Sequence, residues 1–187
     1  MFTTLDPLKR GNPVTLSPDL LTANIPNKPY SVLSTLSKTT GKFYVEITVI
    51  GVGSASGGAS CVGIGNINTP TDSQSYDSTN VRAYGGFVNH DVIGLLIDLT
   101  YGVLTFYKNG SLYGVPFTDI NLLGPVFILL TNTGGDSRTS STMTVNFGRS
   151  VFNFAIPPGF TAWDTTAKLF PLPTTSLFLP TSIENSL

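Results

Sequence analysis

The stretch from Asp91 to Phe117, DVIGLLIDLTYGVLTFYKNGSLYGVPF, constrains the fold of this chain more than any other. Its first part is a nearly continuous apolar run, which is typical of a β-strand buried on both faces. Thr100-Tyr101-Gly102 predicts a turn, and Asn109-Gly110 suits a type I′ hairpin, in which both central residues need positive φ. We therefore predict three consecutive antiparallel strands joined by tight turns, the last running from about Ser111 to Val115.

Several other segments have the pattern of short strands. In residues 43–49 the side chains alternate with the period of two that a sandwich strand requires, so that Phe43, Val45, Ile47 and Val49 share one face. Glu46 belongs to the opposite face, which we expect to point outward. Further strands are predicted for residues 30–36, 61–65, 81–88, 125–130 and 143–147. Because no stretch has a long helical period with capping signals, the predicted fold is an all-β sandwich of two antiparallel sheets with very little helix.

The central stretch also resembles the signature of the SPRY domain family. The residues that match are Asp91-Val92-Ile93-Gly94, Asp98-Leu99, Gly102-Val103-Leu104, Phe106-Tyr107-Lys108-Asn109-Gly110, Gly114 and Phe117. Flanking segments are similar to family motifs in the same order, namely 41–47 (GKFYVEI), 145–148 (VNFG) and 157–160 (PPGF). The opening segments 14–17 and 20–23 resemble the short first strands of bacterial and bacteriophage SPRY domains. The resemblance covers residues 12–164 and implies a β-sandwich that recognises a partner, without naming that partner.

We predict one domain over residues 1–164, followed by a C-terminal tail, residues 165–187. Within the domain, Met1 to Lys28 carries four prolines and is expected to be extended and rich in turns. The tail is rich in proline and in apolar residues, unlike a highly charged disordered linker. The tail either lies back on its own sandwich or docks on another subunit. Its candidate assembly residues are Phe170, Leu172, Leu177, Phe178 and Leu179.

Composition argues against several classes of partner. Only 11% of the residues are charged, and the 10 basic side chains form no cluster, so we expect no binding of nucleic acid. The single cysteine, Cys61, allows no intrachain disulfide and no cysteine-based zinc site, and is expected to be buried in a strand. No signal peptide or transmembrane segment is recognisable, so we predict no membrane insertion and a location in a virion or in the cytoplasm.

Catalytic residue patterns are also missing from the sequence. His90 is the only histidine, and no Gly-x-Ser-x-Gly motif accompanies it. The glutamates are Glu46 and Glu184 alone, and most aspartates occupy turn positions, where they cap the backbone. We therefore predict that the chain is not an enzyme.

Cofactor and metal motifs are equally weak. Residues 63–65 (GIG) lack the third glycine of a dinucleotide-binding motif. Asp72 and Asp77 could ligate calcium together with Asn66 and Asn68, but their spacing is not that of a recognised calcium loop. Trp163 is expected to close the edge of the sandwich rather than to bind a sugar. We predict no cofactor and no metal.

The resemblance implies a ligand site on loops at one end of the sandwich. These are the segment before Gly41 and the two long polar loops, residues 66–80 and 131–142; long loops in compact domains are often functional. The alternative is that they are only solvated connections. Tyr and Arg dominate binding hot spots, while Asn and Gln supply adaptable hydrogen bonds. On residue type, the candidate binding residues are Asn66, Asp72, Gln74, Tyr76, Asn132 and Arg138.

Two functional classes remain open. The first is a bacteriophage virion or fibre component, displayed on an assembly and contacting a host surface. The second is a free-standing intracellular adaptor that binds a protein or peptide. In either class the expected partner is a protein, an assembly subunit or a glycan, and the chain could form a homo-oligomer.

Overall fold

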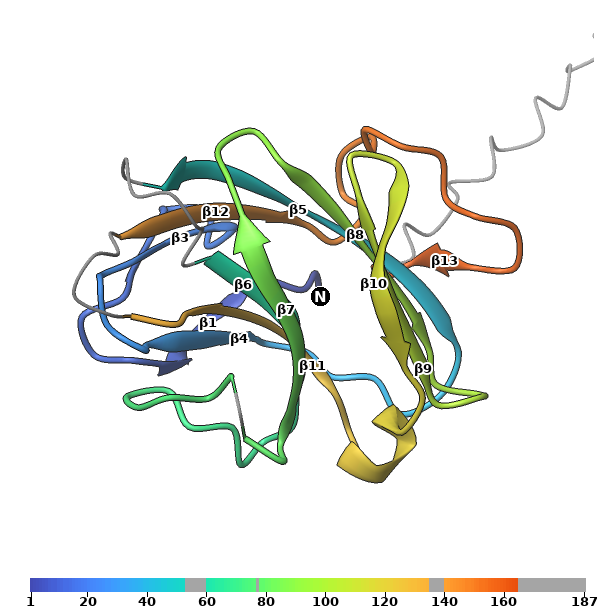
Figure 1. Ribbon diagram of the computed structural model, residues 1–187, viewed down its shortest axis with the longest axis horizontal. Coiled ribbons are helices and arrows are strands. Elements are labelled where there is room, and N and C mark those ends of the chain that lie inside the picture. Colours follow the sequence, from blue (N-terminus) through green and yellow to red (C-terminus); the bar gives the residue numbers. More distant parts are fainter. Residues whose placement is uncertain (53–59, 77, 135–139, 165–187) are drawn as a thin grey trace, which may run out of the picture.

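The computed structural model describes residues 1–52, 60–76, 78–134 and 140–164, which form a sandwich of two antiparallel β-sheets (Figure 1). The first sheet has the strand order β1-β4-β11-β6-β7, and the second has the order β10-β9-β8-β5-β12-β3-β2, with β13 pairing in parallel with β5. This confirms the predicted all-β sandwich. In the described part of the chain the helical element is one 3₁₀ turn, η1 (Ile120–Leu123).

The strands of the five-stranded sheet are β1 (Leu5–Arg10), β4 (Ser31–Ser34), β6 (Ser60–Gly65), β7 (Val81–Phe87) and β11 (Phe127–Asn132). Those of the eight-stranded sheet are β2 (Thr15–Leu16), β3 (Thr22–Ile25), β5 (Lys42–Val52), β8 (Val92–Asp98), β9 (Val103–Lys108), β10 (Ser111–Phe117), β12 (Ser141–Asn146) and β13 (Thr161–Ala162).

The main hydrophobic core lies between the two sheets, where alternate residues of facing strands meet. From β5 it receives Val45, Ile47 and Val49, as the period of two predicts, and all three are fully buried. Cys61 is also buried in its predicted strand, β6. Trp163 belongs to this core and is completely buried, with its ring 5.5 Å from that of Phe43.

The predicted meander is present as β8, β9 and β10. Asn109 and Gly110 both have positive φ, 51° and 80°, as a type I′ turn requires. The third strand is longer than predicted, because β10 passes through an irregular register after Tyr113 and ends at Phe117. Gly114 lies at this irregularity with φ +70°, where a Cβ atom would come within 2.8 Å of the Tyr84 ring.

The N-terminal region contains more regular structure than its prolines predict. The expectation of an extended, turn-rich segment misses β1, which includes Pro7. Proline is tolerated there because β1 is an edge strand, so a missing amide donor leaves no neighbouring strand unpaired. The two opening strands predicted near residues 14–17 and 20–23 correspond to β2 and β3.

The loop from Gly148 to Ala162, which we call the 148–162 loop, covers part of the outer face of β5. Glu46 lies on the outer face of β5, as predicted, but this loop covers it and leaves it only 1% exposed. The Glu46 carboxylate accepts hydrogen bonds from the Asn153 amide (2.7 Å), the Asn153 side chain (3.0 Å), the Phe154 amide (2.9 Å) and the Tyr44 hydroxyl (2.9 Å). A buried carboxylate therefore fastens the loop to the sheet.

The two ends of the described sandwich meet at one corner. The amide and the hydroxyl of Thr3 donate to the Asp164 carboxylate at 2.8 and 2.5 Å, and both residues are buried. The Asp164 amide in turn donates to the Phe147 carbonyl. The predicted tail, residues 165–187, lies outside the described residues, so its two alternative placements stay predictions.

Candidate binding surface

The connection between β6 and β7 folds back over the outer face of the five-stranded sheet. Thr69 is buried against β6, and a Cβ atom on Gly65 would lie 2.4 Å from its hydroxyl oxygen. Tyr76 packs against a second apolar cluster, formed by Leu33, Val81, Ala83, Phe127 and Leu129. The described part of this loop is therefore anchored to the sheet by its own side chains.

Three buried hydroxyl groups join this loop to two strand ends. The Oγ atoms of Ser31 and Ser75 are 2.7 Å apart, and Ser31 also donates to Thr131 at 2.8 Å. Ser75 and Thr131 are 3.2 Å apart, and all three residues are at most 1% exposed. The Ser31 amide adds a backbone bond to the Thr71 carbonyl. Since buried polar groups must find partners within the protein, this network fixes the relative position of the three segments.

The predicted binding residues of the β6–β7 loop occupy different environments. Asp72 and Gln74 are exposed, and Asp72 accepts a hydrogen bond from the Asn12 amide at 2.8 Å. Tyr76 is half-buried, with part of its ring on the apolar cluster. Asn66 is half-buried at the neck of the loop, where its side chain donates to Asn80 at 3.1 Å. Asp72, Gln74 and Tyr76 therefore lie within one short stretch, where the first two are exposed and Tyr76 is half-buried. The β6–β7 loop that carries them lies toward the lower left of Figure 1.

Asn132 is not a loop residue, so that part of the prediction is wrong. Strand β11 continues through Asn132, which is 1% exposed. Its side chain accepts from the Gly134 amide at 2.8 Å and donates to the Ser141 hydroxyl at 3.2 Å. Asn132 thus shapes the start of the β11–β12 connection from inside the fold. Arg138 lies outside the described residues, and its predicted contact with a ligand stays a prediction.

Sequence reasoning missed Ser31, Ser75 and Thr131. Ser31 and Thr131 occupy strand positions that face the loop, yet serine and threonine are common in exposed strands and turns. Their partners are 44, 56 and 100 residues apart in the sequence, so no local pattern marks them.

The aspartates around the central meander have structural partners. Burial alone would raise the pKa of Asp91, but hydrogen bonds from Lys108, the Val88 amide and Asn109 hold that pKa below its ordinary value. The pKa of Asp98 is likewise lowered, because hydrogen bonds from Lys42 and from the Tyr101 and Thr100 amides outweigh its burial. These carboxylates stay ionised and tie the strand ends to the turns.

Arg82 and Asp119 form another structural pair. The Arg82 guanidinium donates to both carboxylate oxygens of Asp119, at 2.8 and 2.6 Å, and this pairing lowers the pKa of Asp119. His90 lies exposed in the turn between β7 and β8, with φ 70°. No group of three or more His, Cys, Asp or Glu side chains is placed to hold a metal ion within the described ranges. In the same part of the chain, no helix is long and apolar enough to span a membrane.

These features define a β-sandwich in which the polar β6–β7 loop lies over one sheet and is anchored there by buried hydroxyl groups. A family model of the SPRY domain matches residues 60–149, from the start of β6 to just beyond β12. Residues 60–149 therefore match the SPRY domain family, which confirms the resemblance that the central stretch carries. SPRY domains mediate protein–protein interactions, and this fits a binding role without catalysis. The finer resemblance, to the bacterial and bacteriophage single-domain type, stays a prediction.

Solved structures with the same fold come from several proteins. The SPRY domain of human HERC1 matches with a TM-score of 0.61 and 14% identity, covering 79% of this chain and 99% of that one. The PSpry domain of TRIM65 matches with a TM-score of 0.53 and 15% identity, over 78% and 92% of the two chains. Stonustoxin matches with a TM-score of 0.55 and 14% identity, over 78% of this chain but only 27% of its own. A search of curated proteins gave no match.

Proposed function

We propose that this chain is a non-enzymatic recognition module that binds a protein or peptide partner through its loop-end surface, formed by Asp72, Gln74 and Tyr76. The observation that carries the proposal is the buried hydroxyl network of Ser31, Ser75 and Thr131. This network holds the β6–β7 loop in place before any partner binds, and preorganisation of this kind lowers the entropic cost of association.

The chemistry of the loop-end surface suits a peptide. Tyr76 offers a ring that is already supported by an apolar cluster, so binding costs it little further side-chain freedom. The exposed side chains of Asp72 and Gln74 supply a carboxylate and an amide beside it for hydrogen bonds to a backbone or to polar side chains.

The proposal is tested with a peptide ligand selected from a random display library against the full chain. The substitution Tyr76→Ala should weaken the binding of the selected peptides by about 1–3 kcal/mol, as expected for an aromatic anchor. Gln74→Ala should have a smaller effect in the same direction. Leu112→Ala is the matched control, because Leu112 is 62% exposed on the other sheet. Binding is measured by calorimetry, and thermal unfolding verifies that each variant is folded. Selected peptides that bind both loop variants as tightly as the unaltered chain would refute the proposal.

A narrower form of the proposal is that the module is displayed on a bacteriophage particle and contacts a host surface. It is supported by the low charge of the sequence and by the apolar residues of the tail, which lies outside the described residues. This form requires the full chain to be oligomeric in solution, which light scattering measures. It also requires Phe178→Ser with Leu179→Ser to reduce the mass to that of a monomer. A monomeric full chain would instead favour the free-standing adaptor.

A further inference from the structure

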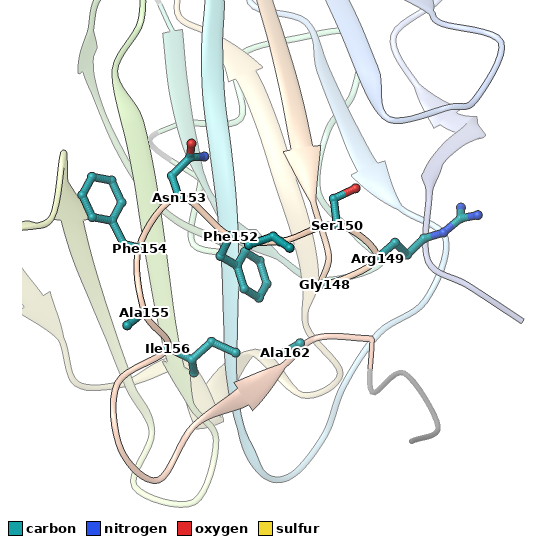
Figure 2. A pocket seen from close by; sticks show the side chains of 10 residues that line it. Gly148, Arg149, Ser150, Phe152, Asn153, Phe154, Ala155, Ile156 and Ala162 are labelled. Carbon is teal, nitrogen blue, oxygen red and sulfur yellow. The ribbon is translucent and has the colours of Figure 1, made fainter. Parts of the chain in front are cut away.

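The 148–162 loop borders a shallow, open hollow on the opposite side of the sandwich from the loop-end surface. Its two ends meet, since a Cβ atom on Gly148 would lie 2.4 Å from that of Ala162. The hollow measures about 550 Å³, and Figure 2 shows Phe152, Ile156 and Ala162 around it. Loops with joined ends are commonly packed by their own side chains, but this one leaves its centre open.

The loop exposes apolar side chains around the hollow. Val151 is 95% exposed and Phe154 is 36% exposed, while Phe152 and Ile156 are half-buried. A second hollow of about 220 Å³ adjoins the first at Phe154 and Ala155, and its other walls are Tyr44, Leu96, Tyr107, Gly110 and Pro157. Clustered apolar exposure of this kind marks a surface that contacts another chain segment.

The framework of the loop is held firmly in place. Glu46 accepts hydrogen bonds from the backbone of Asn153 and Phe154, and the Phe152 ring stands edge-on to that of Tyr44 at 5.0 Å. At the far end, Trp163 donates its amide hydrogen to the Tyr44 carbonyl. The hollow is therefore a formed site, which a segment of suitable chemistry can enter without first ordering the walls.

The chain itself supplies such a segment next to the hollow. Ala162 lines the hollow, and only two residues later Asp164 is anchored by Thr3. Residues 169–173, with the sequence LFPLP, follow within nine residues of this anchor. An extended chain covers about 3.3–3.6 Å per residue, so the short connection from Asp164 allows this segment to reach the hollow that Ala162 lines.

We propose that residues 169–173 occupy the apolar hollow of the 148–162 loop in their own chain. Proline-rich segments favour an extended helix without internal hydrogen bonds, and they bind grooves lined by aromatic side chains. Phe152 and Phe154 supply such side chains in this hollow, and Tyr107 supplies one in the hollow that adjoins it. A short tether gives the segment an effective concentration of roughly millimolar. The tail of a second molecule, at a lower concentration in solution, therefore competes poorly for the hollow. Phe170 and Leu172 provide the apolar side chains that enter.

The first test is photo-crosslinking in the full chain. p-Benzoylphenylalanine replaces Val151, and in a control it replaces Leu8, which is 91% exposed on the other sheet. We expect the label at 151 to form adducts with residues 165–187 in a species of monomer mass, with a yield independent of protein concentration. The label at 8 should form no such adducts. Adducts confined to dimers would assign the hollow to a second copy, and a lack of tail adducts would leave the tail elsewhere; either result overturns the proposal.

The second test needs no label. It compares two apolar pairs of the tail, Phe170 with Leu172 and Phe178 with Leu179. Phe170→Ser with Leu172→Ser should speed amide hydrogen exchange in residues 148–157 several-fold. Phe178→Ser with Leu179→Ser is the matched control and should leave that exchange unchanged. Equal exchange in the first variant and the unaltered chain, or an equal effect of both pairs, would contradict the assignment to residues 169–173.

Discussion

At the scale of single residues, buried polar groups decide how distant segments join. Glu46 is the clearest case, because its partners Asn153 and Phe154 are more than 100 residues away. A buried charge is costly unless hydrogen bonds satisfy it, and four donors do so here. Burial, followed by the bond to Glu46, raises the pKa of Tyr44, so the phenol stays protonated and keeps donating.

Replacing Glu46→Gln should lower the free energy of unfolding by about 1–3 kcal/mol. Glutamine has nearly the same shape, but one carboxylate oxygen is replaced by an NH₂ group. That group cannot accept the hydrogen bonds that Asn153 or Tyr44 donates. The measurement is chemical denaturation at neutral pH. Thr48→Ala, on the same face of β5, serves as a control and should cost less. A glutamine variant as stable as the original chain would mean that the carboxylate is not what fastens the loop.

Asp91 should make the fold sensitive to acid. The fold holds its pKa below the ordinary value of 3.8, so the folded state favours the ionised form. The stability that Asp91 contributes is complete above about pH 5, and it is lost as the pH falls through the lower folded value. In Asp91→Asn, stability at pH 7 should fall by about 1–2 kcal/mol, and the decline between pH 5 and 2 should be shallower. Denaturation curves across that range measure both effects; parallel pH profiles for the two chains would contradict this role.

At the scale of elements, turns with positive φ set the register of the strands. Gly110 has φ +80° in the β9–β10 turn, and a Cβ atom there would also lie 2.8 Å from the Phe154 ring. Gly159 has φ +86°, but nothing lies within 4 Å of the corresponding position. A substitution at Gly159 therefore tests backbone strain alone, whereas one at Gly110 tests strain together with a steric contact.

Gly159→Ala should cost about 1 kcal/mol, the strain of a left-handed conformation alone. Gly110→Ala should cost more, because the added methyl group also displaces Phe154 from the 148–162 loop. Thermal unfolding of both variants measures the difference. Equal losses would show that Phe154 moves aside freely and that the hairpin does not support the loop.

Elements that carry a local sequence pattern were predictable. The meander follows from alternation and from Asn109-Gly110, and β5 follows from its period of two. The burial of Glu46 was not predictable, since the loop that covers it comes from the other end of the domain. Strand β1 was missed because Pro7 reads as a strand breaker unless its position at a sheet edge is known.

The candidate surface was predictable only where the local sequence marks it. The resemblance and the length of the polar loop led to Asp72, Gln74 and Tyr76, whose exposure agrees with a loop. Asn132 was misplaced because TNTGGDS reads as a turn from its first residue, whereas pairing with β6 extends the strand through Asn132. The supporting hydroxyl network depends on contacts across three segments, which a single sequence does not record.

At the scale of the whole molecule, the two surfaces belong to different sheets. The loop-end surface lies over the five-stranded sheet, whereas the 148–162 loop lies over β5 of the other sheet. The main core separates them, and no described residue lines both. The two surfaces should therefore act independently.

Their independence is measurable with the variants already introduced. Phe170→Ser with Leu172→Ser should leave the affinity of a selected loop-end peptide unchanged, within about 0.5 kcal/mol, as for distant sites that share no partners. Calorimetry on the full chain gives this comparison. A larger change in affinity would show that the tail contacts the loop-end surface, or that loss of the tail from the hollow alters that surface through the sandwich.

The hydrogen bonds between Thr3 and Asp164 also hold the first and last described segments of the sandwich next to each other. A host protein that carries residues 3–164 in a surface loop would have its own two flanking segments held side by side, and domains of this kind tolerate such insertion. The same geometry suits circular permutation, in which a short linker joins these ends and the exposed turn at His90 is opened instead. Either rearrangement would carry the loop-end surface intact, because neither the Thr3–Asp164 corner nor the His90 turn contains a residue of the hydroxyl network that supports it.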